Sequence, residues 1–317
     1  MPIDPALERL FTQLPANPLP LEDVEGRRRG NDATVALLGQ ARHPGSSVED
    51  RKIPVDGGEI TLRIVRPAGF EPPGPCYCYI HGGGWFMGTL DTAETECVIQ
   101  PDDVPAVFVF VDYRLAPEHK FPIPHDDCVA AYRYLVEHHE ELGIDAHRIA
   151  IGGGSAGANL SAAVSIAARE AGLPIPCLQL LEVPAVDLTL SSPSVTECGT
   201  GFGLTEEETR QCVRHYLNEG SDPRDPRVSP IFAADLGGLP PALIVVAELD
   251  PVRDDGERYA AALRAAGTEA ACVRVLGHIH GSWVIPGTPA WGVVREMRIS
   301  ALRSAFAGTF APAFARS

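Results

Sequence analysis

A serine among glycines is the first feature of this sequence that could carry out chemistry. The segment Gly-Gly-Ser-Ala-Gly at 153–157, with Ser155 at its centre, follows a strand-like run at 148–151 and precedes a helix-like run at 158–163. A G-x-S-x-G sequence in that context predicts a nucleophile elbow, a sharp turn whose crowding only glycine tolerates. The turn places the hydroxyl at a helix N-terminus, where free N–H groups favour developing negative charge. A strand-to-helix turn without chemistry has the same composition, so the motif is weak alone.

Three other segments add chemical groups in a fixed order. A His-Gly-Gly-Gly-Trp sequence at 81–85 follows an apolar run, and Asp250 and His280 each follow a later buried-strand pattern. The order Ser, Asp, His along the chain, with each residue after a strand, is typical of α/β-hydrolases.

Together these segments resemble the hormone-sensitive-lipase-like esterases, also called the bacterial family IV carboxylesterases. The resemblance runs from about residue 50 to the C-terminus and includes Tyr-Arg-Leu-Ala-Pro-Glu at 113–118, Asp-Pro-Val-Arg-Asp at 250–254 and His-Gly at 280–281. It implies an α/β-hydrolase fold, with a mostly parallel central sheet flanked by helices and a helical cap.

Ester hydrolysis needs a nucleophile, a base, an acid that orients the base, and an oxyanion site. Ser155 is the predicted nucleophile, His280 the base whose ordinary pKa lies near working pH, and Asp250 the orienting acid. His278 competes with His280, but the family pattern places the histidine directly before glycine, so His278 is interpreted as a buried strand-end residue.

Asp254 and Asp255 are rivals of Asp250, which lies closest to the end of the preceding strand. Asp254 is expected instead to cap a helix at 256–266. By resemblance, the oxyanion donors are the N–H groups of Gly83, Gly84 and Ala156, with Gly82 shaping the turn.

Several residues are predicted to line the substrate pocket, and some depart from the family pattern. Trp85 either lines the pocket or has only a packing role. Ser282 stands where the family usually has Phe, and Trp283 follows it. Glu182 lies in an otherwise apolar strand, so it must be paired or protonated. A structural pair with an arginine is favoured for Glu182, and a role in specificity is the alternative. Gly154 stands where relatives commonly have Asp or Thr.

The elements that must position these groups alternate between strands and helices after residue 51, which predicts a mostly parallel sheet covered on both faces. A hairpin is expected around 56–58. Helices are expected at 4–15, 32–40 and 126–141, from the Ser155 turn through 170, and at 205–218. Thr205 is a plausible N-cap of the last one. The arginine triplet at 27–29 is interpreted as a solvated helix end.

The predicted domains are a catalytic α/β-hydrolase domain over 51–186 and 234–317, N-terminal cap helices over 1–50, and a cap insertion over 187–233. In the resembled family this insertion packs with the N-terminal helices over the active site. A surface decoration without that role is the alternative.

Composition limits the partners. The formal net charge of −16 argues against nucleic acid and anionic membranes. The start of the chain has no apolar signal region, and no run is long enough to cross a bilayer, so a cytoplasmic protein without membrane insertion is expected. The eight cysteines show no zinc spacing and are expected to be reduced, mostly in the core. Relatives often dimerise through the last strand, so the resemblance allows a homodimer.

The sequence thus predicts a serine carboxylesterase that acts on short-chain acyl esters through an acyl-enzyme, without metal or organic cofactor. An acyltransferase, lactone-forming or amide-hydrolysing enzyme with the same three residues is the first alternative. A non-catalytic small-molecule receptor is a remote one, because Ser155, Asp250 and His280 are all present.

Overall fold

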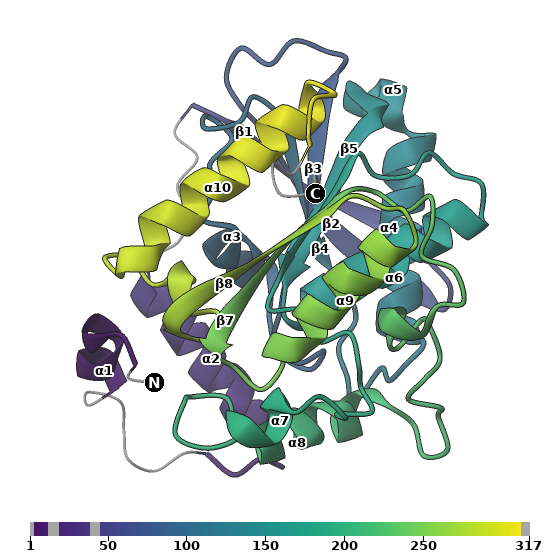
Figure 1. The fold of residues 1–317 in the computed structure, drawn as a ribbon. Coiled ribbons are helices and arrows are strands. Elements are labelled where there is room, and N and C mark those ends of the chain that lie inside the picture. The colour runs from purple at the N-terminus through teal and green to yellow at the C-terminus, as the bar shows by residue number, and fades with distance from the viewer. Residues whose placement is uncertain (1–2, 12–18, 39–44, 312–317) are drawn as a thin grey trace.

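One sheet of eight strands organises the molecule, as the computed structural model in Figure 1 shows. The structure describes residues 3–11, 19–38 and 45–311. The strands lie in the order β1-β2-β4-β3-β5-β6-β7-β8. Their bounds are Ser47–Val55, Gly58–Arg66, Gly74–Ile80, Val107–Asp112, Ile144–Gly154, Leu178–Glu182, Ala242–Leu249 and Ala270–Ile279 for β1 to β8. Only β1–β2 and β2–β4 are antiparallel among these strand pairs.

Helices cover both faces of the sheet. One face carries α4, α6 and α9, and the other carries α3 and α10 (Figure 1). The short helices α7 and α8 lie with α2 near the edge where the parallel strands end (Figure 1). The helix bounds are Pro5–Phe11, Val24–Leu38, Leu90–Cys97, Ile123–Glu137, His139–Leu142, Ala156–Glu170, Ser194–Glu197, Glu206–Tyr216, Arg253–Ala265 and Pro289–Phe306 for α1 to α10, with 3-10 turns at Pro230–Phe232 and Ser282–Val284.

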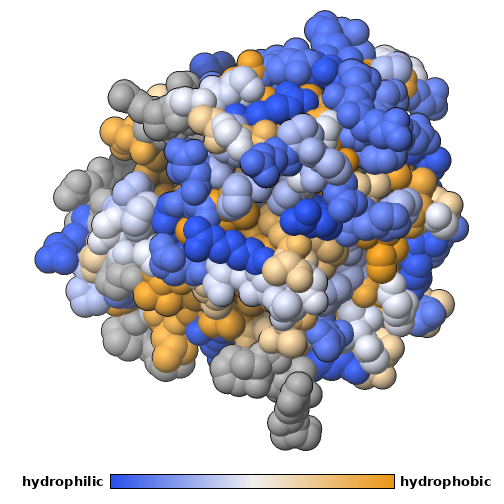
Figure 2. Space-filling model, turned by 90° about the horizontal axis from the view of Figure 1, so that it is seen from above, coloured by the Kyte–Doolittle hydropathy of each residue, from blue (hydrophilic) through white to orange (hydrophobic). Residues whose placement is uncertain are grey.

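The central strands explain why the sheet is buried on both faces. Every residue of β3, β6 and β7 is buried, which is the near-continuous apolar pattern of parallel strands between helical layers. Cys76 and Cys78 lie in this core on β3, and all eight cysteines are free thiols. No helix of the described residues is long and apolar enough to span a bilayer. Hydrophilic residues cover most of the face seen in Figure 2, with hydrophobic ones between them.

Most predicted elements are confirmed, including the hairpin, whose turn residue Gly57 has a φ of +71°. Thr205 caps α8 in a reciprocal capping box with Glu208. The prediction for the arginine triplet was wrong. The triplet lies inside α2, which begins at Val24. The side chains of Arg27 and Arg28 bind polar partners on other segments, whereas Arg29 is exposed. The helix expected over 4–15 is seen as α1, and residues 12–15 and 39–40 of the two N-terminal helix predictions lie outside the described residues.

Candidate active site

Ser155 stands in a strained turn between β5 and α6. Its φ of 55° and ψ of −117° are rare for a residue with a side chain. A Cβ at Gly153 would lie 2.2 Å from the Ile80 carbonyl oxygen, and one at Gly157 would lie 2.0 Å from the same atom. Both positions therefore require glycine, because the turn is pressed against the end of β3.

The side chains of Ser155, His280 and Asp250 form a continuous hydrogen-bonded row. His280 Nε2 lies 2.9 Å from Ser155 Oγ, and His280 Nδ1 lies 2.8 Å from Asp250 Oδ2. The three residues follow β5, β7 and β8, whose carboxyl ends meet at one edge of the sheet. With the Nδ1 hydrogen donated to the carboxylate, Nε2 is free to accept the serine proton.

The environment of His280 favours its charged form. Burial opposes a charge on the ring, but the Asp250 carboxylate and its hydrogen bond outweigh this and, with Glu96, raise the pKa of His280 above 6.5. Asp250 itself is fully buried, and its second oxygen accepts the Val252 N–H at 3.0 Å. The imidazole is therefore held in one orientation by a carboxylate that is itself fixed.

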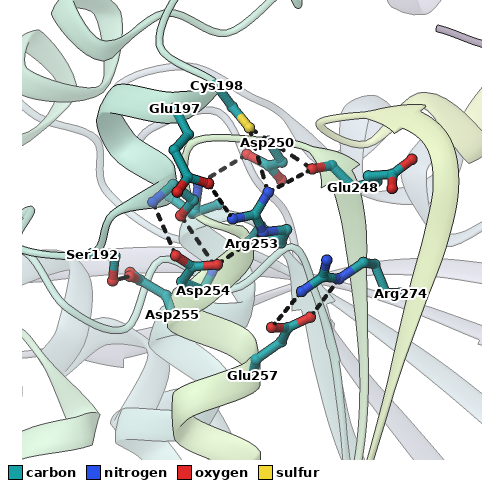
Figure 3. A network of polar contacts seen from close by, with 12 residues as sticks. Ser192, Glu197, Cys198, Glu248, Asp250, Arg253, Asp254, Asp255, Glu257 and Arg274 are labelled. Atoms are coloured by element: carbon teal, nitrogen blue, oxygen red, sulfur yellow. Dashed lines mark hydrogen bonds and ion pairs between the residues drawn. The ribbon is translucent and has the colours of Figure 1, made fainter. Parts of the chain in front are cut away.

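The rival residues have other partners, and Figure 3 shows both aspartates beside Asp250. Asp254 accepts the Ser194 N–H and pairs with Arg253. It does not cap the helix as predicted, because α9 already begins at Arg253 and Asp254 lies in its first turn. Asp255 accepts from the Ser192 hydroxyl. His278 is buried, and its Nδ1 lies 2.8 Å from the Ser282 hydroxyl.

The glycine loop after β3 supplies unused backbone donors beside Ser155. The N–H groups of Gly83, Gly84 and Ala156 have no acceptor in the described part of the chain. Gly82 differs, because its N–H donates to Glu96 Oε2 at 2.8 Å. Gly83 has a φ of +100°, and a Cβ there would lie 2.3 Å from the Met87 carbonyl oxygen. The loop thus has this shape only with glycine.

A cavity of about 270 Å³ opens over these groups. Its wall is mostly apolar and comes from both the sheet edge and the segments above it. Trp85 lines it and stacks on Tyr216 with ring centroids 4.7 Å apart. Leu204 lies before α8, and α8 itself contributes Thr209, Cys212 and Val213. Helix α2 contributes Arg27, which pairs with Glu208 at 2.9 Å.

Of the residues predicted for the pocket, Trp85, Glu182 and Trp283 line the cavity and Ser282 does not. The prediction for Ser282 was wrong because its hydroxyl turns back to His278 and accepts the Ile279 N–H. Glu182 has the arginine partner that its structural interpretation predicts, and its role in specificity stays a prediction. Its Oε1 lies 2.9 Å from Arg298 Nη2, its Oε2 accepts the Trp283 indole N–H, and it also borders the cavity.

Sequence reasoning missed Glu96, which stands on α3 and lines the cavity beside Ser155. Burial raises its pKa to about 7, although the Gly82 N–H acts in the opposite direction. A glutamate in a short helix is usually exposed, so composition offered no signal. Within the described ranges, no group of three or more His, Cys, Asp or Glu side chains could hold a metal ion.

Comparisons with known proteins identify the family of the chain. A family model described as an alpha/beta hydrolase fold matches residues 77–284. The chain is 45% identical to the carboxylic ester hydrolase LipN of Mycobacterium tuberculosis over 74% of this chain and 64% of LipN. It is 37% identical to the carboxylesterase NlhH of the same species over 90% of this chain and 91% of NlhH. A solved hyperthermophilic esterase from the archaeon Pyrobaculum calidifontis superposes with a TM-score of 0.88 at 36% identity, covering 96% of this chain and 99% of that one.

Proposed function

The chain belongs to the α/β-hydrolase-fold carboxylesterases that resemble hormone-sensitive lipase, and from this we propose that Ser155, His280 and Asp250 are its catalytic triad. The protein is a serine esterase, as its relatives are carboxylic ester hydrolases, and its substrates are small esters. The row of hydrogen bonds from Ser155 through His280 to Asp250 is the observation that supports the assignment of the three residues.

Acylation begins when Ser155 Oγ attacks the ester carbonyl carbon while His280 Nε2 takes the hydroxyl proton. Asp250 stabilises the imidazolium that forms. The carbonyl oxygen becomes an oxyanion and accepts hydrogen bonds from the Gly83, Gly84 and Ala156 N–H groups, which have no other acceptor in the described chain. The tetrahedral intermediate then collapses, the bond to the alcohol oxygen breaks, and His280 gives its proton to the leaving alcohol.

Deacylation repeats the sequence with water as the nucleophile. His280 takes a proton from water, the hydroxide oxygen attacks the acyl carbon, and the bond to Ser155 Oγ breaks as Oγ recovers the proton. The products are the carboxylic acid and free enzyme. Because His280 must be neutral at the start of each half-reaction, its raised pKa sets the lower pH limit of turnover.

We further propose that residues 1–50 and 187–233 act as a cap that limits substrate length. Cys212 and Val213 of α8 line the cavity, and Arg27 of α2 joins α8 through Glu208. Arg28 of α2 binds the Phe86 and Ala116 carbonyl oxygens, which attaches this helix to the glycine loop. A small, mostly apolar cavity of about 270 Å³ supports short-chain acyl esters as substrates.

A burst assay tests the triad. 4-Nitrophenyl butyrate should give a rapid release of nitrophenol followed by steady turnover, and a fluorophosphonate should label Ser155. Ser155→Ala should lose both labelling and turnover, whereas unchanged turnover in that variant would refute the assignment. Adding an alcohol tests the acyl-transfer alternative, because a transferase forms a new ester in competition with water.

A further inference from the structure

Glu96 is a carboxylate of the active-site cavity that the proposed reaction does not use. It stands near the end of α3 and lines the cavity together with Ser155. Its Oε2 accepts the Gly82 N–H at 2.8 Å, whereas its Oε1 has no hydrogen-bond donor among the described residues. An unfilled acceptor on the wall of a substrate cavity can receive a donor from the substrate itself.

Gly154 leaves this carboxylate uncovered. A Cβ at residue 154 would lie 3.8 Å from Glu96 Oε2 and 3.7 Å from the Tyr79 hydroxyl oxygen, both ordinary contact distances. A side chain at this position would therefore contact the Oε2 edge of the Glu96 carboxylate. Gly154 stands directly before Ser155, and Glu96, Gly154 and Ser155 all line the same cavity.

The other charged side chains that line the cavity have ionic partners, whereas no ionic partner of Glu96 lies within 3–11, 19–38 or 45–311. Among the described residues, the pairs are Arg27 with Glu208, Glu182 with Arg298, and His280 with Asp250. Partial burial without an ionic partner among the described residues raises the pKa of Glu96 to about 7. A cation brought by the substrate would complete this site, and an anionic substrate would be repelled by it.

We propose that Glu96 is a specificity-determining residue that selects esters carrying a protonated amine near the ester group. The amine N–H would donate to Glu96, and its charge would be neutralised in a water-poor site where such hydrogen bonds are strong. The net charge of −16 would also draw cations toward the protein. This proposal rests on the proposed function, because Glu96 acts only on substrates that Ser155 hydrolyses.

Isosteric ester pairs provide the probe. 2-(Dimethylamino)ethyl butyrate and 3-methylbutyl butyrate differ by a protonated nitrogen in place of a CH group on the alcohol side. Ethyl 4-(dimethylamino)butyrate and ethyl 5-methylhexanoate make the same exchange on the acyl side. The ratio of kcat/KM for the cationic and neutral members, measured by acid release at about pH 8, above the pKa of Glu96, cancels differences in enzyme concentration.

Glu96→Gln keeps an acceptor for the Gly82 N–H and removes the charge, so it should lower this ratio about tenfold or more for at least one pair. Gly154→Ala keeps the carboxylate and adds a methyl group 3.8 Å from its Oε2, which narrows the approach to the carboxylate, so this variant should lower the same ratio. Glu137→Gln removes an exposed carboxylate at the far end of α4 and should leave the ratio unchanged.

Two outcomes would overturn the proposal. In the first, both pairs keep their wild-type ratios in Glu96→Gln and in Gly154→Ala. In the second, Glu96→Gln slows the cationic and neutral esters equally, which would make Glu96 only a support for the glycine loop. Neither outcome would touch the triad, since the neutral esters would still require Ser155; loss of that requirement would instead refute the proposed function.

Discussion

The backbone carbonyl of Glu182 accepts the hydrogen bond of the Ser155 N–H at 2.8 Å. The same residue reaches in the other direction with its side chain, to Arg298 Nη2 at 2.9 Å and to the Trp283 indole. One residue at the end of β6 thus links the turn that holds Ser155 to α10 and to a wall of the cavity. Loss of the buried ion pair should therefore also disturb the turn that holds Ser155.

Glu182→Leu should lower the free energy of unfolding by about 3–5 kcal/mol, because Arg298 is fully buried and would lose its ionic partner. Arg298→Met should cost a similar amount for the same reason. The double variant Glu182→Leu, Arg298→Met should recover much of the loss, since no unpaired buried charge remains. Urea unfolding of the three variants measures this cycle, and additive losses would show that the two side chains act independently.

The pH dependence of kcat/KM should reflect His280 and its neighbour Glu96. Since the base must be neutral and its pKa is raised, activity toward a neutral ester should fall as the pH drops through a midpoint above 6.5. The charged groups facing Glu96 are Glu182 on β6, His280 after β8 and Arg298 on α10. Glu96→Gln removes a negative charge that stabilises the imidazolium, so the midpoint should move to lower pH. A midpoint that moves upward would contradict this sign.

Gly83→Ala should reduce kcat by about 10²–10³, the loss typical of one oxyanion donor. Its φ of +100° and the 2.3 Å approach to the Met87 carbonyl oxygen force the loop to change shape. Gly292→Ala is the matched control, because a methyl group added at that helical glycine in α10 would meet no atom within 4 Å. The control should keep full activity and gain about 0.5–1 kcal/mol of stability.

Arg28→Ala should loosen the N-terminal helix from the glycine loop. The side chain donates to two backbone carbonyl oxygens and pairs with Glu118, so its loss should expose α2 to proteolysis and raise KM for esters. Arg29→Ala provides the comparison, as Arg29 is exposed and has no described partner. Limited proteolysis and initial rates on both variants would distinguish them, and equal behaviour would count against an attached cap.

The fold was predictable because its signals are local. The turn at Ser155 requires glycines because it contacts the end of β3, and these glycines stand together in the sequence. An apolar run such as 242–247 predicts a buried strand from its own residues alone. Glu96 and Arg298 could not be found this way. Glu96 lines the cavity, and Arg298 lies buried behind it beside Glu182, only because α3 and α10 pack on the same face of the sheet. Nothing in their own segments indicates that.

The wrong predictions follow the same rule. Arginine is usually exposed, which favours a solvated helix end for Arg27 and Arg28, yet they reach Glu208 and the Phe86 carbonyl across large separations in sequence. Ser282 follows the His-Gly pair, which favours a place in the pocket, but its hydroxyl satisfies a buried histidine instead. Partners that are distant in the sequence determine where such side chains lie, and a single sequence does not reveal those partners.

The three side chains that we propose as the triad follow β5, β7 and β8, and the last of these strands lies at the edge of the sheet. A chain still emerging from the ribosome would hold its hydroxyl at residue 155 long before its imidazole at residue 280 existed. On this assignment, esterase activity should therefore appear only when β8, the last strand, has joined the sheet. In a refolding experiment, recovered turnover would report completion of the whole sheet, while helix content could return earlier.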